Sequence, residues 1–107
     1  MRLVLLVALV ACQTSDVSRR LGARCTLATE CDQRCLTGGD WPGGLCTTAC
    51  DTDASCDPGA ACVDDNGGGV CVFACRTDPE CAFLGGYRCV MVDRHGGGNQ
   101  VSVCRGG

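Results

Sequence analysis

Twelve of the thirteen cysteines in this 107-residue chain fall into three consecutive copies of one four-cysteine pattern. The copies cover residues 25–46, 50–71 and 75–104, and three residues join each copy to the next. The middle copy has the spacing C-x5-C-x5-C-x8-C, and the outer copies keep the first interval and vary the other two. Such a cysteine content in a short chain is typical of a disulfide scaffold.

The remaining composition makes disulfides necessary. Beyond residue 12 the chain has only eighteen large apolar side chains, counting Val, Leu, Met, Phe, Trp and Tyr. A core of that size cannot stabilise the chain without cross-links. Six disulfides, at roughly 2–4 kcal/mol each, would supply the difference by restricting the unfolded chain. Because such bonds persist outside the cytosol, we expect an exported protein.

The spacing of the last two cysteines of each copy predicts a β-hairpin. Their separations are 11, 9 and 15, and an odd separation lets two cysteines face each other across a two-residue turn. The turns then fall on Asp40-Trp41, Asn66-Gly67 and Gly96-Gly97. The last two are favourable turn dipeptides, because both central positions require positive φ. The expected opposing pairs are Cys35 and Cys46, Leu36 and Leu45, Cys62 and Cys71, Val63 and Val70, Cys89 and Cys104, Val90 and Val103, Met91 and Ser102, and Val92 and Val101.

The disulfides are expected to stay within copies. We favour pairing of the first cysteine with the third and of the second with the fourth, because this joins the five-residue loop to both strands of the hairpin. Pairing of the third with the fourth stays an alternative, although it would leave the loop attached only to itself. The twelve cysteines assigned to these bonds are Cys25, Cys31, Cys35, Cys46, Cys50, Cys56, Cys62, Cys71, Cys75, Cys81, Cys89 and Cys104.

Strand alternation in the third hairpin separates two faces. One face holds Cys89, Met91, Ser102 and Cys104, and the other holds Val90, Val92, Val101 and Val103. The valine face either packs against a neighbouring copy or is displayed to a partner. We favour packing, because a chain this poor in apolar residues rarely exposes four of them together.

The five-residue loops between the first two cysteines (TLATE, DTDAS and RTDPE) are rich in Thr and Asp, which bond nearby backbone in turns. The alternation of Asp51, Asp53, Ser55 and Asp57 also resembles the start of a calcium loop. The twelfth position is cysteine rather than the bidentate glutamate, and the sixth is not glycine. We therefore interpret these carboxylates as turn formers and expect no bound metal and no cofactor.

The chain offers little for catalysis or for zinc. His95 is the single histidine, and we expect it to be a solvated residue at a hairpin tip. Twelve thiols in an exported chain form disulfides rather than zinc sites. Trp41, the single tryptophan, either anchors a partner or folds over its own disulfides. The net charge is −3 without a basic run, which argues against nucleic acid. We do not expect an enzyme.

The N-terminus resembles a bacterial lipoprotein signal. Arg2 is followed by an unbroken apolar run at residues 3–11, which is too short to span a bilayer. The run ends in Leu-Val-Ala-Cys, which is similar to the lipobox. The resemblance implies cleavage after residue 11, acylation of Cys12 and, from Gln13, an outer-membrane destination. The alternative is an ordinary secretory signal with an incidental cysteine.

We expect residues 12–24 to form the lipidated cysteine and a polar tether (QTSDVSRRLGAR after the cysteine). Arg19 and Arg20 are interpreted as an exposed linker pair, with contact to anionic headgroups as the alternative.

The pattern CT-x4-C-x3-CL, followed by G-x-C-T-x2-C-x-TD-x2-C-x-P-x-G-x2-CV, resembles the cysteine-rich repeat lipoproteins of high-G+C Gram-negative bacteria. Those repeats are similar to Dickkopf-type domains and, more loosely, to EGF-like modules. The resemblance covers residues 25–104 and implies small disulfide-bonded hairpin modules with an extracellular interaction role. It carries over no catalytic residue.

Taken together, the sequence predicts a small disulfide-rich protein of three four-cysteine modules, each a loop plus a short β-hairpin, with little or no helix outside the signal peptide. The predicted function is a lipid-anchored binding or structural module of the bacterial outer membrane or cell surface. An extracellular protein or polysaccharide is the expected kind of partner. One alternative is a knottin-like protease inhibitor that presents Arg76 or Arg94, because disulfide-bonded loops are preorganised for binding. Another is a calcium-dependent adhesion module.

Overall fold

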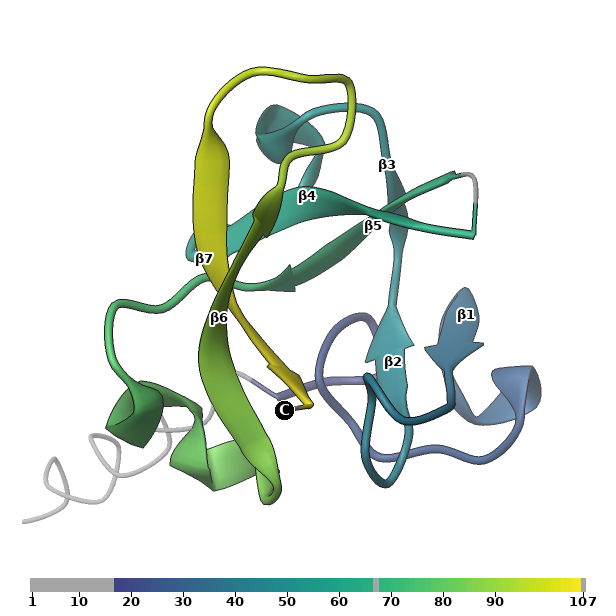
Figure 1. The fold of residues 1–107 in the computed structure, drawn as a ribbon. Helices are drawn as coiled ribbons and strands as arrows, with labels where there is room; N and C mark the ends of the chain where they lie inside the picture. The colour runs from purple at the N-terminus through teal and green to yellow at the C-terminus, as the bar shows by residue number, and fades with distance from the viewer. Residues whose placement is uncertain (1–16, 67, 107) are drawn as a thin grey trace, which may run out of the picture.

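The computed structural model describes residues 17–66 and 68–106 (Figure 1). These residues form short antiparallel sheets and three short 3-10 helices, so the predicted class, a small disulfide-rich and mostly β protein, is confirmed. The elements in chain order are η2 (Ala28–Glu30), β1 (Arg34–Leu36), β2 (Leu45–Thr47), β3 (Ala49–Cys50), η3 (Asp53–Ser55), β4 (Ala60–Asp65), β5 (Gly68–Phe73), η4 (Asp78–Leu84), β6 (Tyr87–Asp93) and β7 (Gln100–Gly106).

The predicted hairpin registers are confirmed in all three copies. Cys35 lies opposite Cys46, Cys62 opposite Cys71, and Cys89 opposite Cys104. The apolar pairs next to them follow the same register, including Leu36 with Leu45, Val63 with Val70, and Val92 with Val101. The two hairpins of the second and third copies are the longest paired segments of the fold.

The turns agree with the prediction less well than the strands do. In the second copy Asp65 pairs with Gly68, and Asn66 has a φ of +49°, as a tight turn requires; Gly67 lies outside the described residues. In the third copy the pairing ends at Asp93 and Gln100, which leaves a wider loop at residues 94–99 instead of a turn at Gly96-Gly97. The loop is wider because its first residues pair with the second copy.

The predicted disulfide pairing is the pairing in the structure. Every bond stays within its copy and joins the first cysteine to the third or the second to the fourth. The six bonds are Cys25–Cys35, Cys31–Cys46, Cys50–Cys62, Cys56–Cys71, Cys75–Cys89 and Cys81–Cys104.

Carboxylates organise the five-residue loops, each of which contains a 3-10 turn. Glu30 accepts the backbone N–H groups of Thr26 and Leu27, and these two hydrogen bonds lower its pKa below the ordinary value of 4.5. In the third copy Glu80 likewise accepts the N–H of Arg76, at 2.6 Å. In these two loops the local turn is held by a glutamate, whereas the sequence pattern indicated threonine and aspartate for this role.

The aspartates of the second and third loops reach farther than a local turn. Asp53 Oδ1 accepts the N–H of Cys62 at 2.8 Å, and Asp78 Oδ1 accepts the N–H of Cys89 at 2.9 Å. Both aspartates occupy the third loop position, and both bind the third cysteine of their copy. They therefore fasten the loop to the hairpin at the position where a disulfide also joins them.

The three-residue linkers between copies take part in β-strand pairing and are not irregular loops. The first linker leads from β2 into β3, which pairs with β5 of the second copy. Thr47 is fully buried and its hydroxyl donates to the carbonyl oxygen of Cys71 at 2.5 Å. The second linker continues β5, and its Ala74 bridges to Val103 of the third copy. Each copy is thus hydrogen-bonded to the next through the chain that connects them.

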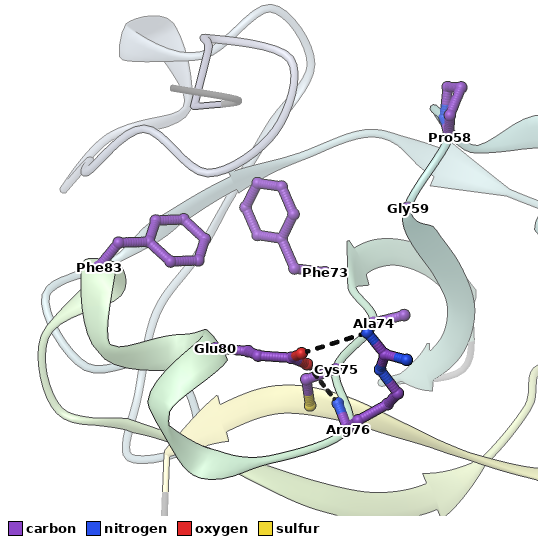
Figure 2. A pocket seen from close by; sticks show the side chains of 8 residues that line it. All are labelled: Pro58, Gly59, Phe73, Ala74, Cys75, Arg76, Glu80 and Phe83. Carbon is purple, nitrogen blue, oxygen red and sulfur yellow. Dashed lines mark hydrogen bonds and ion pairs between the residues drawn. The ribbon is translucent and has the colours of Figure 1, made fainter. Parts of the chain in front are cut away.

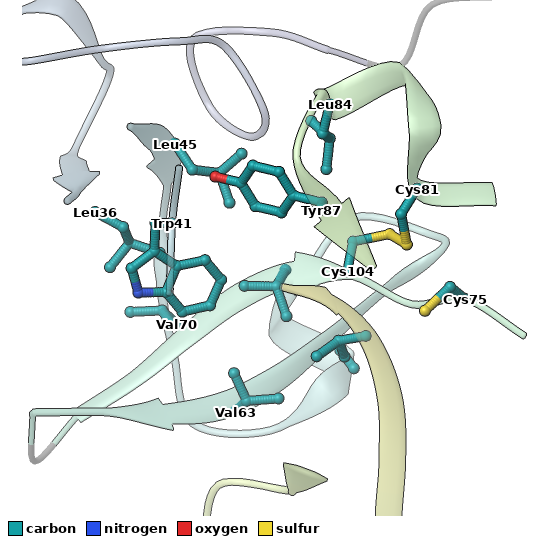
Figure 3. Packing of buried hydrophobic residues seen from close by; sticks show 13 residues of the cluster. Leu36, Trp41, Leu45, Val63, Val70, Cys75, Cys81, Leu84, Tyr87 and Cys104 are labelled. Carbon is teal, nitrogen blue, oxygen red and sulfur yellow. A yellow bond between two sulfur atoms is a disulfide. The ribbon is translucent and has the colours of Figure 1, made fainter. Parts of the chain in front are cut away.

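All three copies share one apolar core (Figure 3). Val103 of the valine face is fully buried there, and Val92 and Val101 pack against it, so this face packs as expected. Trp41 is only 3% exposed and lies in the shared core, so neither sequence interpretation of it is right. The core consists of Leu36, Trp41, Leu45, Ala61, Val63, Val70, Val72, Cys75, Cys81, Leu84, Tyr87, Val103 and Cys104.

The third copy also contacts the first. The N–H of Gly106 donates to the carbonyl oxygen of Asp40 at 2.8 Å, and Arg105 forms an ion pair with the Asp40 carboxylate at 2.7 Å. The guanidinium of Arg24 lies 5.9 Å from the centre of the Tyr87 ring and donates to the carbonyl oxygens of Pro42, at 2.6 Å, and Leu84. The copies therefore close on one another instead of forming a linear array.

The expected tether is partly folded, which corrects the sequence interpretation of residues 17–24. Leu21 is 4% exposed and packs with cysteines of the second copy. Gly22 and Ala23 exchange backbone hydrogen bonds with Cys46. These contacts exist because Leu21 finds an apolar site that only the assembled copies provide. The signal segment, Cys12 and Gln13 lie outside the described residues.

Candidate functional site

An aromatic pocket lies between the second and third copies (Figure 2). Phe73 is the last residue of β5, and Phe83 lies in η4, so two elements of different copies form the pocket. The two rings meet edge to face, with centres 5.3 Å apart and planes at 73°. The cavity measures about 430 Å³ and is lined by Pro58, Gly59, Phe73, Ala74, Cys75, Arg76, Glu80 and Phe83.

One rim of this pocket is polar. The side chain of Arg76 is 89% exposed, and its guanidinium lies 3.7 Å from the carboxylate of Glu80, four residues along the chain. The second oxygen of Glu80 is held by the backbone N–H of the same arginine, as the dashed lines in Figure 2 show. Phe83 is 55% exposed, so a large apolar ring is presented next to this ion pair.

A second cavity adjoins the other side of Phe73. It measures about 370 Å³ and is lined by Leu21, Asp57, Pro58 and Phe73. Asp57 forms an exposed ion pair with Arg20 at 3.2 Å, and Arg19 pairs with Asp32 at 3.5 Å. The two arginines that were interpreted as a linker pair are therefore exposed, as expected, and bound to carboxylates of the first two copies.

A polar cavity lies where loop 94–99 contacts the second copy. Arg94 bridges to Val63 by backbone and forms an ion pair with Asp53, and the N–H of His95 donates to the carbonyl oxygen of Cys62 at 2.9 Å. The cavity measures about 580 Å³ and is lined by Asp51, Thr52, Asp53, Ala54, Arg94, His95, Gly96, Gly97 and Asn99.

The four residues of the calcium-like pattern do not converge on one point. Asp51 and Asp53 line the polar cavity, whereas Asp57 lines the cavity beside Phe73 and binds Arg20. Both oxygens of Asp53 are used, one by Cys62 and one by Arg94. In the part of the chain that the structure describes, the side-chain groups with metal-site geometry are three clusters of cysteines, all of them in disulfides.

His95 is not the solvated turn residue that the sequence suggested. Its side chain is 27% exposed, and its Nδ1 lies on the carboxylate of Asp64 in β4. The contact exists because the wide loop folds back onto the second copy. No motif or spacing in the sequence indicated that His95 contacts Asp64. The contact between Phe73 and Phe83 was likewise not indicated by the sequence.

The two arginines considered for protease inhibition are placed differently. Arg94 forms an ion pair with Asp53, so its side chain is not free to enter the specificity pocket of a protease. Arg76 lies in the loop between Cys75 and Cys81 and extends into solvent.

Comparison with known proteins adds no relative: neither protein-family models, nor curated proteins, nor solved structures give a match. Among the described residues, no helix combines the length and apolar character needed to cross a membrane. The six disulfides define a small extracellular-type module of an oxidising compartment.

Proposed function

We propose that the protein is a lipid-anchored module of the bacterial envelope surface, with a binding or structural role and no catalytic activity. One observation carries the anchor: the six disulfides use all twelve cysteines of residues 25–104 and leave Cys12 outside them. An exported chain seldom keeps an odd cysteine without a use for it. A lipid on Cys12 accounts for the odd thiol, and the lipobox-like Leu-Val-Ala-Cys directly precedes it.

The binding role follows from the scaffold. Six disulfides and a core shared by three copies hold the surface cavities in fixed shapes, so a partner would bind with little loss of conformational entropy. The cysteine-rich repeat lipoproteins that the sequence resembles supply the same expectation. The single histidine is engaged by Asp64 and the backbone of Cys62, which supports a structural role for it.

Mass spectrometry of the mature protein tests this proposal. We expect the chain to begin at Cys12, to carry acyl chains on that residue and to partition into detergent. Cys12→Ser should abolish acylation and detergent partitioning while leaving the six disulfides intact. A wild-type protein that stays in the aqueous phase with Cys12 in a disulfide would contradict the proposal.

Protease inhibition remains a second candidate because of Arg76, whose side chain is 89% exposed within a disulfide-bounded loop. Titration against a trypsin-like protease tests it. Inhibition that is lost in Arg76→Ala and kept in Arg94→Ala would support it, and no inhibition by the wild-type protein would exclude it.

A further inference from the structure

Apolar side chains from four separate segments form one exposed patch beside the residue at which the described chain begins. We call it the aromatic patch, and it consists of Val17, Pro58, Phe73 and Phe83. Phe83 is 55% exposed and Val17 is 38% exposed. Phe73 joins them: its ring is in edge contact with Phe83 and packs over Gly22, where Val17 also lies.

The patch is continuous because Gly22 has no side chain. A Cβ at Gly22 would lie 2.7 Å from Cε2 of Phe73 and 3.4 Å from Cγ2 of Val17. These two side chains are therefore neighbours over one glycine, and the N-terminal segment is part of the surface that Phe73 and Phe83 present. Pro58 lines both cavities on either side of Phe73 and extends the patch along the second copy.

The charges around the patch are paired. Of the two carboxylates that line its cavities, Asp57 forms an ion pair with Arg20 and Glu80 with Arg76. The most exposed charged side chain at its edge is that of Arg76. The patch thus combines exposed aromatic carbon with a rim of paired charges, and an anionic surface meets no unpaired carboxylate in those two cavities.

The length of chain before Val17 brings the patch close to the proposed anchor. Four residues lie between Cys12 and Val17, so the two α-carbons are five residue steps apart and at most about 18 Å from each other when the chain is fully extended. Because residues 17–24 are folded onto the first two copies, the tether cannot lengthen at their expense. A lipid on Cys12 would therefore hold the face that carries Val17 next to the bilayer.

We propose that the aromatic patch docks on the membrane that holds the lipid of Cys12, with Phe83 at the boundary between headgroups and acyl chains. This inference rests on the proposed lipid anchor. Amphipathic surfaces with exposed aromatic rings bind at this boundary, and a second attachment strengthens a lipid anchor. Docking also sets the orientation of the molecule, because a short tether and a surface contact together allow little rotation.

The orientation has a consequence for the polar cavity. The η4 helix and loop 94–99 lie at opposite ends of β6 (Figure 1), and seven residues of antiparallel strand cover about 20 Å. When Phe83 contacts the bilayer, the cavity lined by Arg94, His95 and Asp51 points away from it. In this orientation the polar cavity faces solvent and is accessible to a binding partner.

Tryptophan scanning on vesicles tests the docking. The lipidated full-length protein is reconstituted in phosphatidylethanolamine and phosphatidylglycerol vesicles whose acyl chains are brominated below the headgroup. We compare Phe83→Trp with Met91→Trp, a matched control because Met91 is 60% exposed on the third copy outside the patch. The native Trp41 is buried, and its signal is subtracted using the wild-type protein.

We expect the fluorescence added by Phe83→Trp to be quenched at least twofold more than that added by Met91→Trp. Equal quenching in protein that floats with the vesicles would overturn the docking and leave the anchor intact. Protein that does not float would instead refute the anchor, and the docking with it. As a measurement without variants, amide exchange at residues 78–84 should slow several-fold on vesicles while exchange at residues 94–99 stays unchanged; slowing at both or neither would count against the inference.

Discussion

Single carboxylates in this protein hold loops, strands and neighbouring copies at the same time. Asp53 is the clearest case, because it binds the N–H of Cys62 within its own copy and the guanidinium of Arg94 from the third copy. The sequence pattern allowed a calcium ligand at this position and favoured a turn-forming carboxylate. The structure instead assigns its charge to an arginine and its second oxygen to the backbone.

We expect Asp53→Ala to destabilise the protein by about 1–3 kcal/mol, because it leaves the N–H of Cys62 and the charge of Arg94 without their partner. Asp53→Asn should cost less, since the amide oxygen still accepts the N–H of Cys62. Asp51→Ala is the matched control and should change stability little, because Asp51 is exposed. Denaturant unfolding with the disulfides intact measures these differences; an Asp51 variant as unstable as the Asp53 variant would contradict the assignment.

Tyr87 shows the effect of burial on one titrating group. Its side chain is 5% exposed, and its hydroxyl is buried without a hydrogen-bond partner. Burial disfavours the phenolate and raises the pKa of Tyr87 from 10.0 to about 12, although the charge of Arg24 opposes this shift.

Because the pKa of Tyr87 is higher in the folded than in the unfolded protein, ionisation of Tyr87 costs no stability below pH 10. It lowers the free energy of unfolding as the pH rises from about 10 to about 12. Because Tyr87 is the single tyrosine, ultraviolet absorbance of the phenolate reports its titration directly. We expect a midpoint well above 10 in the native protein and near 10 after reduction and denaturation. Tyr87→Phe should be at least as stable as wild type, and a native midpoint at 10 would show that the ring is hydrated.

Among the elements, the hairpin of the second copy carries the most specific backbone requirement. Asn66 has a φ of +49° in the turn that follows the last pair of the hairpin, Asp65 and Gly68. Asparagine tolerates this left-handed conformation, and β-branched residues resist it.

We therefore expect Asn66→Val to cost about 1–2 kcal/mol and Asn66→Gly to cost little. Asp64 and Asp65 would be poor control positions, because Asp64 contacts His95 and Asp65 forms an ion pair with Arg34; Asn66→Asp, which tolerates the same conformation, serves better. Thermal unfolding compares the three variants. Equal melting temperatures for the valine and glycine variants would show that the turn does not impose this conformation.

The three copies pack into one unit, and we expect them to unfold together. Its shared core takes residues from every copy, its linkers pair as strands, and Arg24 and Gly106 close the third copy on the first. Because every disulfide stays within its copy, the three copies could in principle fold independently. The apolar residues of a single copy are too few to form a hydrophobic core of their own, so the copies share one.

Trp41→Ala tests this cooperativity. Truncating a fully buried tryptophan removes contacts with all copies, and we expect a loss of about 3–5 kcal/mol. Amide exchange should then accelerate in β4–β5 and β6–β7 as well as in β1–β2. Faster exchange limited to residues 34–47 would indicate independent modules.

The sequence alone predicted the strand register and favoured the disulfide pairing that the structure has, although it left another pairing open. Both depend on short separations within one copy: an odd cysteine spacing determines which side chains face each other, and a five-residue loop can join a hairpin in few ways. The class of the fold and the oxidising compartment follow from the same cysteines.

Only the tertiary structure decided how the copies are joined, that Trp41 lies in their common core, that residues 17–24 are folded, and that loop 94–99 binds Asp53 and Asp64. These features depend on contacts between residues such as Arg24 and Leu84 or Phe73 and Phe83, which follow no periodicity. A sequence pattern records which face of a strand is apolar, but the identity of the surface that covers it is determined by where the chain returns in space.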